Sequence, residues 1–402
     1  MNRSSAQPWL ADHWAASQHN FAAEIAVPAH PAVIHDITVR DGEESADLAF
    51  SVEDKVRIAE ALERVGVRRM ELFLTVPGWL EAVRAIMRRR LGLTLYVTWQ
   101  PGRVERALEL GVRHIMVWYR IGEVYQRHVL KRSREELLDE MLAAVRDARE
   151  AGAQVNLFLP ESTRASLEHI RTAAQAAERE GASAVTVVDS QGVARPAAIT
   201  YLVRQLKSWT GLGVEVHCHN DFGLAVANVL AAYEGGADGL HCAVNAVGYR
   251  AGNAALEEVA MALEVLYGVD TGLRLDLLPE LSRLVEEITG LPNGYFKPVV
   301  GRGAFSYEQW SATAALTAGG ARPYAFPYEP EAIGRSPRLV VGKWSDLGAV
   351  AQKLAEFGLT ASPEQLQTIL RRSQVAGVAH HRPLRDDEFL AIAKEEGARP
   401  GE

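Results

Sequence analysis

The chain has 402 residues, 48% of them hydrophobic and 23% charged, which is enough apolar material for two or three domains or for one barrel with an appendage. This composition excludes an intrinsically disordered chain, and no uncharged apolar run approaches the roughly 18 residues that would predict a membrane span. The formal net charge of −8 gives no electrostatic reason to expect nucleic acid or an anionic membrane as a partner.

Residues 1–30 are expected to form an N-terminal arm. They are rich in alanine and end in a proline-punctuated stretch at 27–31. Because they lack the basic start and apolar core of a secretion signal, we expect a cytoplasmic protein. Two cysteines, Cys218 and Cys242, form no CxxC pattern and predict no disulfide framework.

From residue 32 onward, strand-like runs alternate with helix-like stretches. Runs rich in Val, Ile and Leu lie at 32–38, 69–75, 93–98, 112–118, 154–159, 184–189, 213–218 and 239–244. Stretches with helical spacing lie at 52–65, 78–90, 102–110, 133–151, 165–181, 196–208, 222–235 and 253–267. This alternation with continuously apolar strands predicts a parallel sheet covered by helices.

The number of these units favours a (β/α)₈ TIM barrel at 31–290 over an open doubly wound sheet. A doubly wound sheet usually binds a nucleotide at a glycine-rich first turn, and residues 40–44, RDGEE, contain no GxGxxG pattern. Beyond the barrel the alternation stops. We expect a linker region at 291–345 and a helical C-terminal subdomain at 346–402.

Reactive side chains fall at the carboxyl ends of the predicted strands, where a barrel of this kind carries its active site. In strand order these residues are Arg40 and Asp41, Glu71, Glu161, Asp189 and Ser190, His217 and His219, and Asn253. Charges buried at a barrel end are costly unless they are paired or bind a metal.

The sharpest local pattern is residues 217–221, HCHND. Residues i and i+2 of a strand face the same side, so the imidazoles of His217 and His219 can bind one ion. An HxH pair alone is also explained by one core histidine and one surface histidine, but Asp41 at the same barrel end favours a metal. Imidazole with carboxylate and amide oxygens suits Mn²⁺, Zn²⁺, Co²⁺ or Mg²⁺, and the sequence does not choose among these ions.

The stretch 248–253, GYRAGN, follows the eighth predicted strand. Its glycines permit close backbone approach, and the helix N-terminus that follows favours an anion. A plain N-cap by Asn253 explains the same pattern, so the residues alone leave both interpretations open.

Three motifs resemble those of the isopropylmalate, citramalate and homocitrate synthase family, which is related to hydroxymethylglutaryl-CoA lyase. Residues 36–44, DITVRDGEE, look like the family's DxTxRDGEQ opening, with Glu44 in place of glutamine. Residues 217–225, HCHNDFGLA, look like its HxHNDxGLA signature, and 244–254, VNAVGYRAGNA, are similar to its VNGIGERAGNA. The resemblance covers most of residues 32–395.

The resemblance implies an acyltransferase that carries out a Claisen-type condensation, in which an acyl-CoA or another carbanion donor attacks a 2-oxo acid. It implies metal ligands at Asp41, His217, His219 and Asn253. Arg40, Ser190 and Asn253 would contact the substrate, with Arg40 polarising the keto oxygen, Glu71 supporting Arg40, and Glu161 at the family's acidic position. A homodimer is also implied.

The residues that generate the carbanion in this family, which lie after the barrel, differ in this sequence. The family carries a segment like AFTHESGIHVDG after the barrel, whose histidines help to generate the enolate. The aligned run 304–312, AFSYEQWSA, has Tyr307 and Ala312 at those positions. Tyr307, Tyr324 or Tyr328 would then have to remove the proton from the acyl-CoA. A phenol with a pKa of ~10 is a poor base at neutral pH. The alternative is that these tyrosines have only a packing role.

Two other functions stay open. A carbon–carbon lyase or decarboxylase of the same superfamily needs no deprotonation of an acyl-CoA, which would fit the lost histidines. A non-catalytic relative would keep the barrel and the metal but form no product. Product formation from acetyl-CoA distinguishes the synthase from the lyase, and any turnover argues against a non-catalytic protein.

Overall fold

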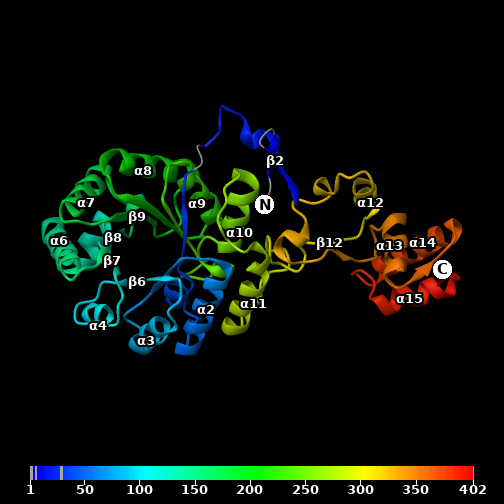
Figure 1. Ribbon diagram of the computed structural model, residues 1–402, viewed down its shortest axis with the longest axis horizontal. Coiled ribbons are helices and arrows are strands. Elements are labelled where there is room, and N and C mark those ends of the chain that lie inside the picture. The colour runs from blue at the N-terminus through cyan, green and yellow to red at the C-terminus, as the bar shows by residue number, and fades with distance from the viewer. Residues whose placement is uncertain (1–2, 5–6, 28–29, 402) are drawn as a thin grey trace. The chain divides into compact units, whose positions relative to one another are not determined.

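The computed structural model describes residues 3–4, 7–27 and 30–401 (Figure 1). The chain divides into two compact units. Ile25–Asn293 form one unit, and Met1–Glu24 together with Gly294–Glu402 form the other. The domain limits expected from the sequence, with a barrel at 31–290, remain predictions.

Parallel strands close into a barrel in the first unit, with β11 pairing to β4 through the register Gly239↔Val33 to Cys242↔Asp36. In chain order the strands are β4 (Val33–Asp36), β5 (Arg69–Leu72), β6 (Thr94–Thr98), β7 (His114–Trp118), β8 (Gln154–Leu159), β9 (Ala184–Asp189), β10 (Gly213–Cys218) and β11 (Gly239–Cys242). Every strand falls within an apolar run expected from the sequence, and the predicted TIM barrel is confirmed.

Helices surround these strands (Figure 1). They are α2 (Val52–Val65), α3 (Trp79–Arg89), α4 (Val104–Glu109), α6 (Arg134–Glu150), α7 (Leu167–Arg179), α8 (Pro196–Trp209), α9 (Ala225–Glu234), α10 (Leu256–Ala262) and α11 (Leu278–Thr289). Two short helices, α1 (Thr38–Asp41) and α5 (Glu123–Tyr125), follow strands β4 and β7.

Local sequence fixes where these helices begin and end, as α2 shows. The Ser51 hydroxyl accepts a hydrogen bond from the Asp54 N–H, and the Asp54 carboxylate accepts one from the Ser51 N–H. This capping box satisfies N–H groups that the first turn of a helix leaves unpaired. Gly66, with φ of 100°, ends the helix in the left-handed conformation that glycine adopts without strain.

The second unit contains a small antiparallel sheet and a set of C-terminal helices. Near the N-terminus, β1 (Arg3–Ser4), β2 (Gln7–Ala11) and β3 (Trp14–Ala15) form an antiparallel sheet. The C-terminal helices are α12 (Ser311–Ala318), α13 (Leu347–Glu356), α14 (Pro363–Ala379) and α15 (Asp386–Glu395). The expected helical subdomain is confirmed, and its core includes Val350, Ile369 and Phe389.

The C-terminal part also contains strands that the sequence did not predict. They are the pair β12 (Ser306–Tyr307) with β13 (Arg338–Leu339) and the pair β14 (Leu359–Thr360) with β15 (Arg399–Pro400). Two-residue strands carry no periodicity, so no sequence pattern marks them. No helix in the described ranges is both long and apolar enough to cross a bilayer.

Candidate functional site

The turn after β4 brings Arg40 and Asp41 to the carboxyl end of the barrel. Asp36 ends the strand, and its carboxylate accepts hydrogen bonds from the Thr38 N–H at 3.0 Å and the Thr38 hydroxyl at 2.6 Å. The Thr38 hydroxyl in turn accepts a bond from the Val244 N–H at 2.9 Å, which ties this turn to the loop after β11. Burial raises the pKa of Asp36 to about 7.

Asp41, His217 and His219 form a buried group at this end of the barrel. The Nε2 atoms of the two histidines lie 3.2 Å apart. Asp41 Oδ2 lies 3.5 Å from Nε2 of His217 and 4.0 Å from Nε2 of His219. The structure therefore brings together the carboxylate and the HxH pair that lie far apart in the sequence.

The protonation states of this group suit a cation. Burial, with the nearby Arg40 charge, lowers the pKa of His217 well below its usual value, and burial also lowers the pKa of His219. Burial alone would raise the pKa of Asp41, but the charge of Arg40 and hydrogen bonds from Asn253 and Tyr249 hold it below its usual value. One carboxylate and two neutral imidazoles are a donor set for a divalent metal.

Asn253 lies beside this group. Its Nδ2 donates hydrogen bonds to Asp41 Oδ1 at 2.8 Å and to the Val247 carbonyl at 3.1 Å. Its Oδ1 is buried and has no hydrogen-bond partner in the described part of the chain, so Asn253 stays a predicted ligand. Asn253 does not cap the following helix, because the N-cap of α10 is Ala255. The N-cap interpretation of the sequence is therefore wrong.

Arg40 is almost fully buried, with 1% of its surface exposed. Its Nη1 donates to Asp41 Oδ2 at 2.7 Å and to Glu44 Oε1 at 3.0 Å, and its Nε lies 3.2 Å from Glu71 Oε2. The predicted pairing of Arg40 with Glu71 is thus present in the structure. Nη2 has no acceptor among the described residues, which leaves a charged donor for a bound molecule.

A cavity of about 540 Å³ opens above these groups. Arg40, Asp41, His217 and His219 line it, as do the sequence candidates Glu161 and Ser190. The Ser190 hydroxyl accepts a hydrogen bond from the Glu161 N–H at 2.8 Å, while the Glu161 carboxylate lies 3.7 Å from Arg164. Glu161 adopts a left-handed φ of 70°, a strained conformation for this residue.

Residues of the β7 and β8 ends also line this cavity, and sequence reasoning did not select them. They are Trp118, Arg120 and Phe158. Trp118 stacks on Phe158, with ring centroids 4.8 Å apart. The available signal was their position at or just after a strand end, which is the same signal that selected Glu161 and Ser190.

Tyr307 lies in the other compact unit, on β12. Its ring packs against Phe326 at 5.5 Å and Trp310 at 6.4 Å between centroids. Burial raises the pKa of Tyr307 above its usual value, which makes its phenol a weaker acid. A catalytic role for Tyr307 therefore stays a prediction.

The barrel interior holds a second buried group that sequence reasoning missed. Glu215 Oε2 lies 2.9 Å from His241 Nε2 and 3.6 Å from His35 Nδ1. Arg69 Nη1 donates to the other carboxylate oxygen at 2.8 Å. Because Arg69 already neutralises Glu215, this group is a buried charge network. Glu215 precedes His217 by two residues on β10, and that spacing was the signal to follow.

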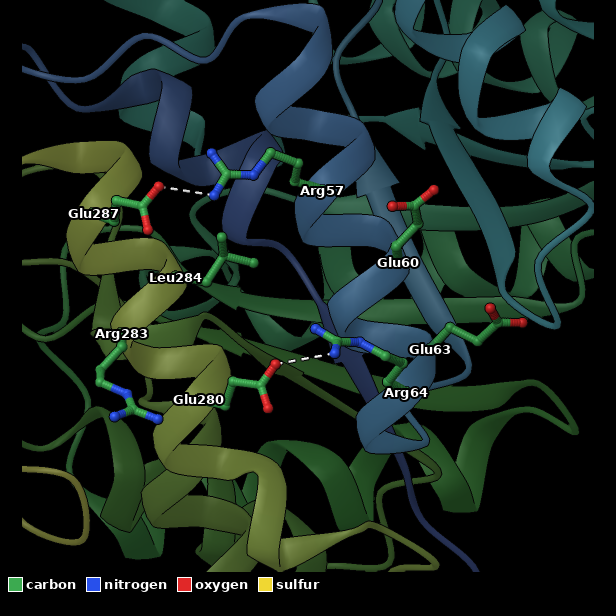
Figure 2. A pocket seen from close by; sticks show the side chains of 8 residues that line it. All are labelled: Arg57, Glu60, Glu63, Arg64, Glu280, Arg283, Leu284 and Glu287. Carbon is green, nitrogen blue, oxygen red and sulfur yellow. Dashed lines mark hydrogen bonds and ion pairs between the residues drawn. The ribbon is translucent and has the colours of Figure 1, made fainter.

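A wider groove of about 750 Å³ lies between α2 and α11 (Figure 2). Its charged side chains pair with one another: Arg57 with Glu287 at 2.8 Å and Arg64 with Glu280 at 3.0 Å. These four side chains are largely solvent-exposed. Exposed ion pairs of this kind contribute little energy and leave no buried polar atom unsatisfied, so we place the candidate site at the barrel mouth.

The fold and this site define a class: a TIM barrel whose mouth carries a buried carboxylate, two imidazoles, an amide and an arginine. Residues 32–285 match the HMGL-like family, and the chain belongs to that family. This confirms the resemblance seen in the three sequence motifs.

Named relatives are similar over most of the chain. Homocitrate synthase AksA of Methanopyrus kandleri is 37% identical over 350 residues, which make up 86% of this chain and 87% of that protein. The 2-isopropylmalate synthase of Methanocaldococcus jannaschii is 34% identical over 355 residues, 86% of this chain and 68% of that protein. In fold, the chain is similar to the HMG-CoA lyase of Bacillus subtilis, with a TM-score of 0.60, 23% identity and coverage of 67% of this chain and 96% of that one.

Proposed function

We propose that this protein is a metal-dependent acyltransferase that joins an acyl-CoA, or another carbanion donor, to the carbonyl carbon of a 2-oxo acid. The observation that carries the proposal is the buried Arg40 Nη2, a charged donor without an acceptor beside the Asp41, His217 and His219 group. The named activities of the relatives, homocitrate synthase and 2-isopropylmalate synthase, support the same reaction class.

Each site residue has a distinct part in the proposal. Asp41, His217, His219 and Asn253 would hold a divalent ion, which when bound supplies Lewis acidity toward a carbonyl. Arg40 donates a hydrogen bond to the keto oxygen, where negative charge develops as the new bond forms. Glu71 keeps the Arg40 guanidinium in place by an ion pair of 3.2 Å. Ser190, at the cavity wall, contacts the substrate.

The proposed reaction removes a proton from the α-carbon of the acyl-CoA. The electron pair left on that carbon forms a bond to the keto carbon, and the keto oxygen takes up a proton. Water then cleaves the thioester and releases coenzyme A as a thiol. The base is unassigned between Glu161, which lines the cavity, and Tyr307 of the C-terminal segment.

A carbon–carbon lyase is the second candidate, and the segment 304–312 favours it. This segment has Tyr307 and Ala312 where the synthases that it resembles have histidines. Cleavage next to a carbonyl needs no deprotonation of an acyl-CoA, so the loss of those histidines would be tolerated.

We further propose that the protein acts as a homodimer, to be tested by light scattering.

Incubation with a panel of 2-oxo acids and acyl-CoAs tests the proposal. The full-length protein is loaded with Mn²⁺, and release of coenzyme A thiol is followed. The synthase proposal predicts thiol release that requires both substrates and yields a branched hydroxy acid. Cleavage of a hydroxyacyl-CoA into an acyl-CoA and a carbonyl compound, with no thiol released, would favour the lyase. The absence of turnover with every pair would reject both.

A further inference from the structure

Arg120 lies two residues after the end of β7 and lines the cavity that contains the candidate metal group. It is half-buried, and its Cζ lies 5.6 Å from the ring centroid of Trp118 and 5.0 Å from that of Tyr125. Two aromatic rings therefore hold the guanidinium in place. The Arg120 carbonyl also accepts a hydrogen bond from Gln126 Nε2 at 2.9 Å, which fixes the backbone at this point.

The charge of Arg120 is uncompensated, unlike that of the other arginines in the cavity. Arg40 pairs with Asp41 and Glu44, and Arg250 donates hydrogen bonds of 2.8 and 2.7 Å to the Asp221 carboxylate. The remaining arginine of the cavity, Arg164, lies 3.7 Å from the Glu161 carboxylate. In the part of the chain that the structure describes, Arg120 has no carboxylate partner. An anionic ligand would supply the missing charge.

Arg120 lies within reach of a molecule held at Arg40. The Cζ atoms of Arg40 and Arg120 are 5.5 and 5.6 Å from the same Trp118 ring centroid, so they are at most about 11 Å apart. A guanidinium carbon lies roughly 4 Å from the carbon of a carboxylate that it binds. At this upper limit, a gap of a few ångström separates a keto group at Arg40 from a carboxylate at Arg120, which two or three carbon–carbon bonds are long enough to cover.

We propose that Arg120 binds a second carboxylate of the acceptor, so that the substrate is a 2-oxo dicarboxylate; this inference rests on the proposed function. The planar guanidinium matches a carboxylate through two parallel hydrogen bonds. The buried indole N–H of Trp118, which has no acceptor among the described residues, is a further donor beside it. The phosphates of coenzyme A share this anionic chemistry, and kinetics separate the two sources.

Direct binding to the full-length, Mn²⁺-loaded protein tests the inference without turnover. Calorimetry compares 2-oxoglutarate with 2-oxopentanoate, which has the same chain length but no distal carboxylate. The wild-type protein should bind the dicarboxylate about 10- to 100-fold more tightly, the value of a hydrogen-bonded charge pair. Arg120→Gln should abolish this preference without weakening 2-oxopentanoate, and Arg120→Lys should retain part of it.

Arg132→Gln is the matched control, because this exposed arginine lies on the same connection between β7 and α6 and pairs with Glu140. It should leave the preference unchanged. Equal binding of both acids by the wild-type protein, or an undiminished preference in Arg120→Gln, would overturn the inference. So would an Arg120→Gln protein with a raised KM for the acyl-CoA alone, which would place a phosphate at Arg120. Failure of the proposed function gives a different result: no thiol release from any acyl-CoA, whatever the binding preference.

Discussion

At the scale of single residues, burial decides what the charged groups of this barrel can do. Arg40, Asp41 and Glu71 would each be costly in the barrel end alone, and the two carboxylates are each stabilised by an ion pair with the Arg40 guanidinium. Among the described residues, Asn253 Oδ1 has no hydrogen-bond partner, nor have Nη2 and Nε of Arg40, of which Nε lies in the ion pair with Glu71. Unsatisfied buried groups of this kind are typical of binding sites.

Arg40→Ala should lower turnover by about 10²–10³, the usual cost of losing one donor to a developing oxyanion. Steady-state kinetics with the best substrate pair measures the effect, and circular dichroism checks the fold. Arg57→Ala, a change of an exposed arginine away from the cavity, serves as the control. A variant of Arg40 that keeps most of its activity would remove this residue from the proposed mechanism.

The second residue-scale prediction concerns His35, whose pKa is lowered to about 4, first by burial and then by the charge of His241. The unfolded chain takes up this proton near pH 6.5 and the folded chain only near pH 4, so the free energy of unfolding falls as the pH drops between these values. His35→Phe preserves the ring contacts to Tyr96 and His241 and removes the titration.

Between about pH 7 and about pH 5, the loss of unfolding free energy should be smaller in His35→Phe than in the wild-type protein by on the order of 2 kcal/mol. Urea unfolding at the two pH values measures it. Exposed His380→Phe should lose as much stability as the wild-type protein over the same range. An unchanged pH dependence in His35→Phe would show that His35 does not contribute to the acid sensitivity.

At the scale of elements, the loop between β11 and α10 positions Asp41 and Asn253, two of the proposed ligands. The Tyr249 N–H donates to Asp41 Oδ1 at 2.9 Å, and Asn253 reaches the same oxygen. Gly248 permits this approach, because a Cβ at this position would lie 2.0 Å from Asn253 Nδ2 and 2.6 Å from Asp41 Oδ1. The close approach, which the sequence pattern suggested for the glycines, is present at Gly248.

Gly248→Ala should therefore displace Asn253 and Asp41 and lower the amount of Mn²⁺ bound per chain while the barrel stays folded. Equilibrium dialysis with metal analysis measures binding. His217→Ala, which removes a proposed ligand, gives the amount of bound Mn²⁺ expected when the site is lost. Gly294→Ala, where an added Cβ meets nothing within 4 Å, should bind metal like the wild-type protein. Full metal content in Gly248→Ala would show that the loop does not position the ligands.

At the scale of the whole molecule, the site candidates are divided between two compact units. Asp41, His217 and Asn253 belong to the unit 25–293, whereas Tyr307 belongs to the other. The barrel unit keeps every motif of the resemblance that concerns the metal and the keto group. In the resemblance, Tyr307 and Ala312 stand in place of the family's enolate-forming histidines, so we propose that the carbanion-forming step is the altered one.

We therefore predict that the protein uses plain acetyl-CoA poorly, because the loss of one general base costs about 10²–10⁴-fold. A donor with a more acidic α-proton should restore turnover, since a weaker base then suffices. Steady-state kinetics with acetyl-CoA and several 2-oxo acids measures the effect. A kcat/KM of about 10⁴ M⁻¹s⁻¹ or above with acetyl-CoA would show that Tyr307 and Ala312 replace the histidines without loss.

The sequence by itself determined the barrel and the position of most candidate residues. Each continuously apolar run predicts one buried strand, and parallel strands place their carboxyl ends together. Arg40, His217 and Ser190 were therefore expected at one rim of the barrel. The helices of the C-terminal part followed from periodicity in the same way. These features depend on neighbours in the chain, which a sequence displays directly.

Only the tertiary structure decided which polar groups are satisfied and which are not. Whether Asn253 caps a helix or faces Asp41, whether Glu215 is paired, and whether Arg120 has a counterion all depend on residues far away in the chain. Hydrogen bonds and ion pairs act over a few ångström, and no spacing rule reports such distances between separate strands. The expected metal ligands were therefore readable from motifs, whereas only the folded barrel shows that Arg120 has no carboxylate partner among the described residues.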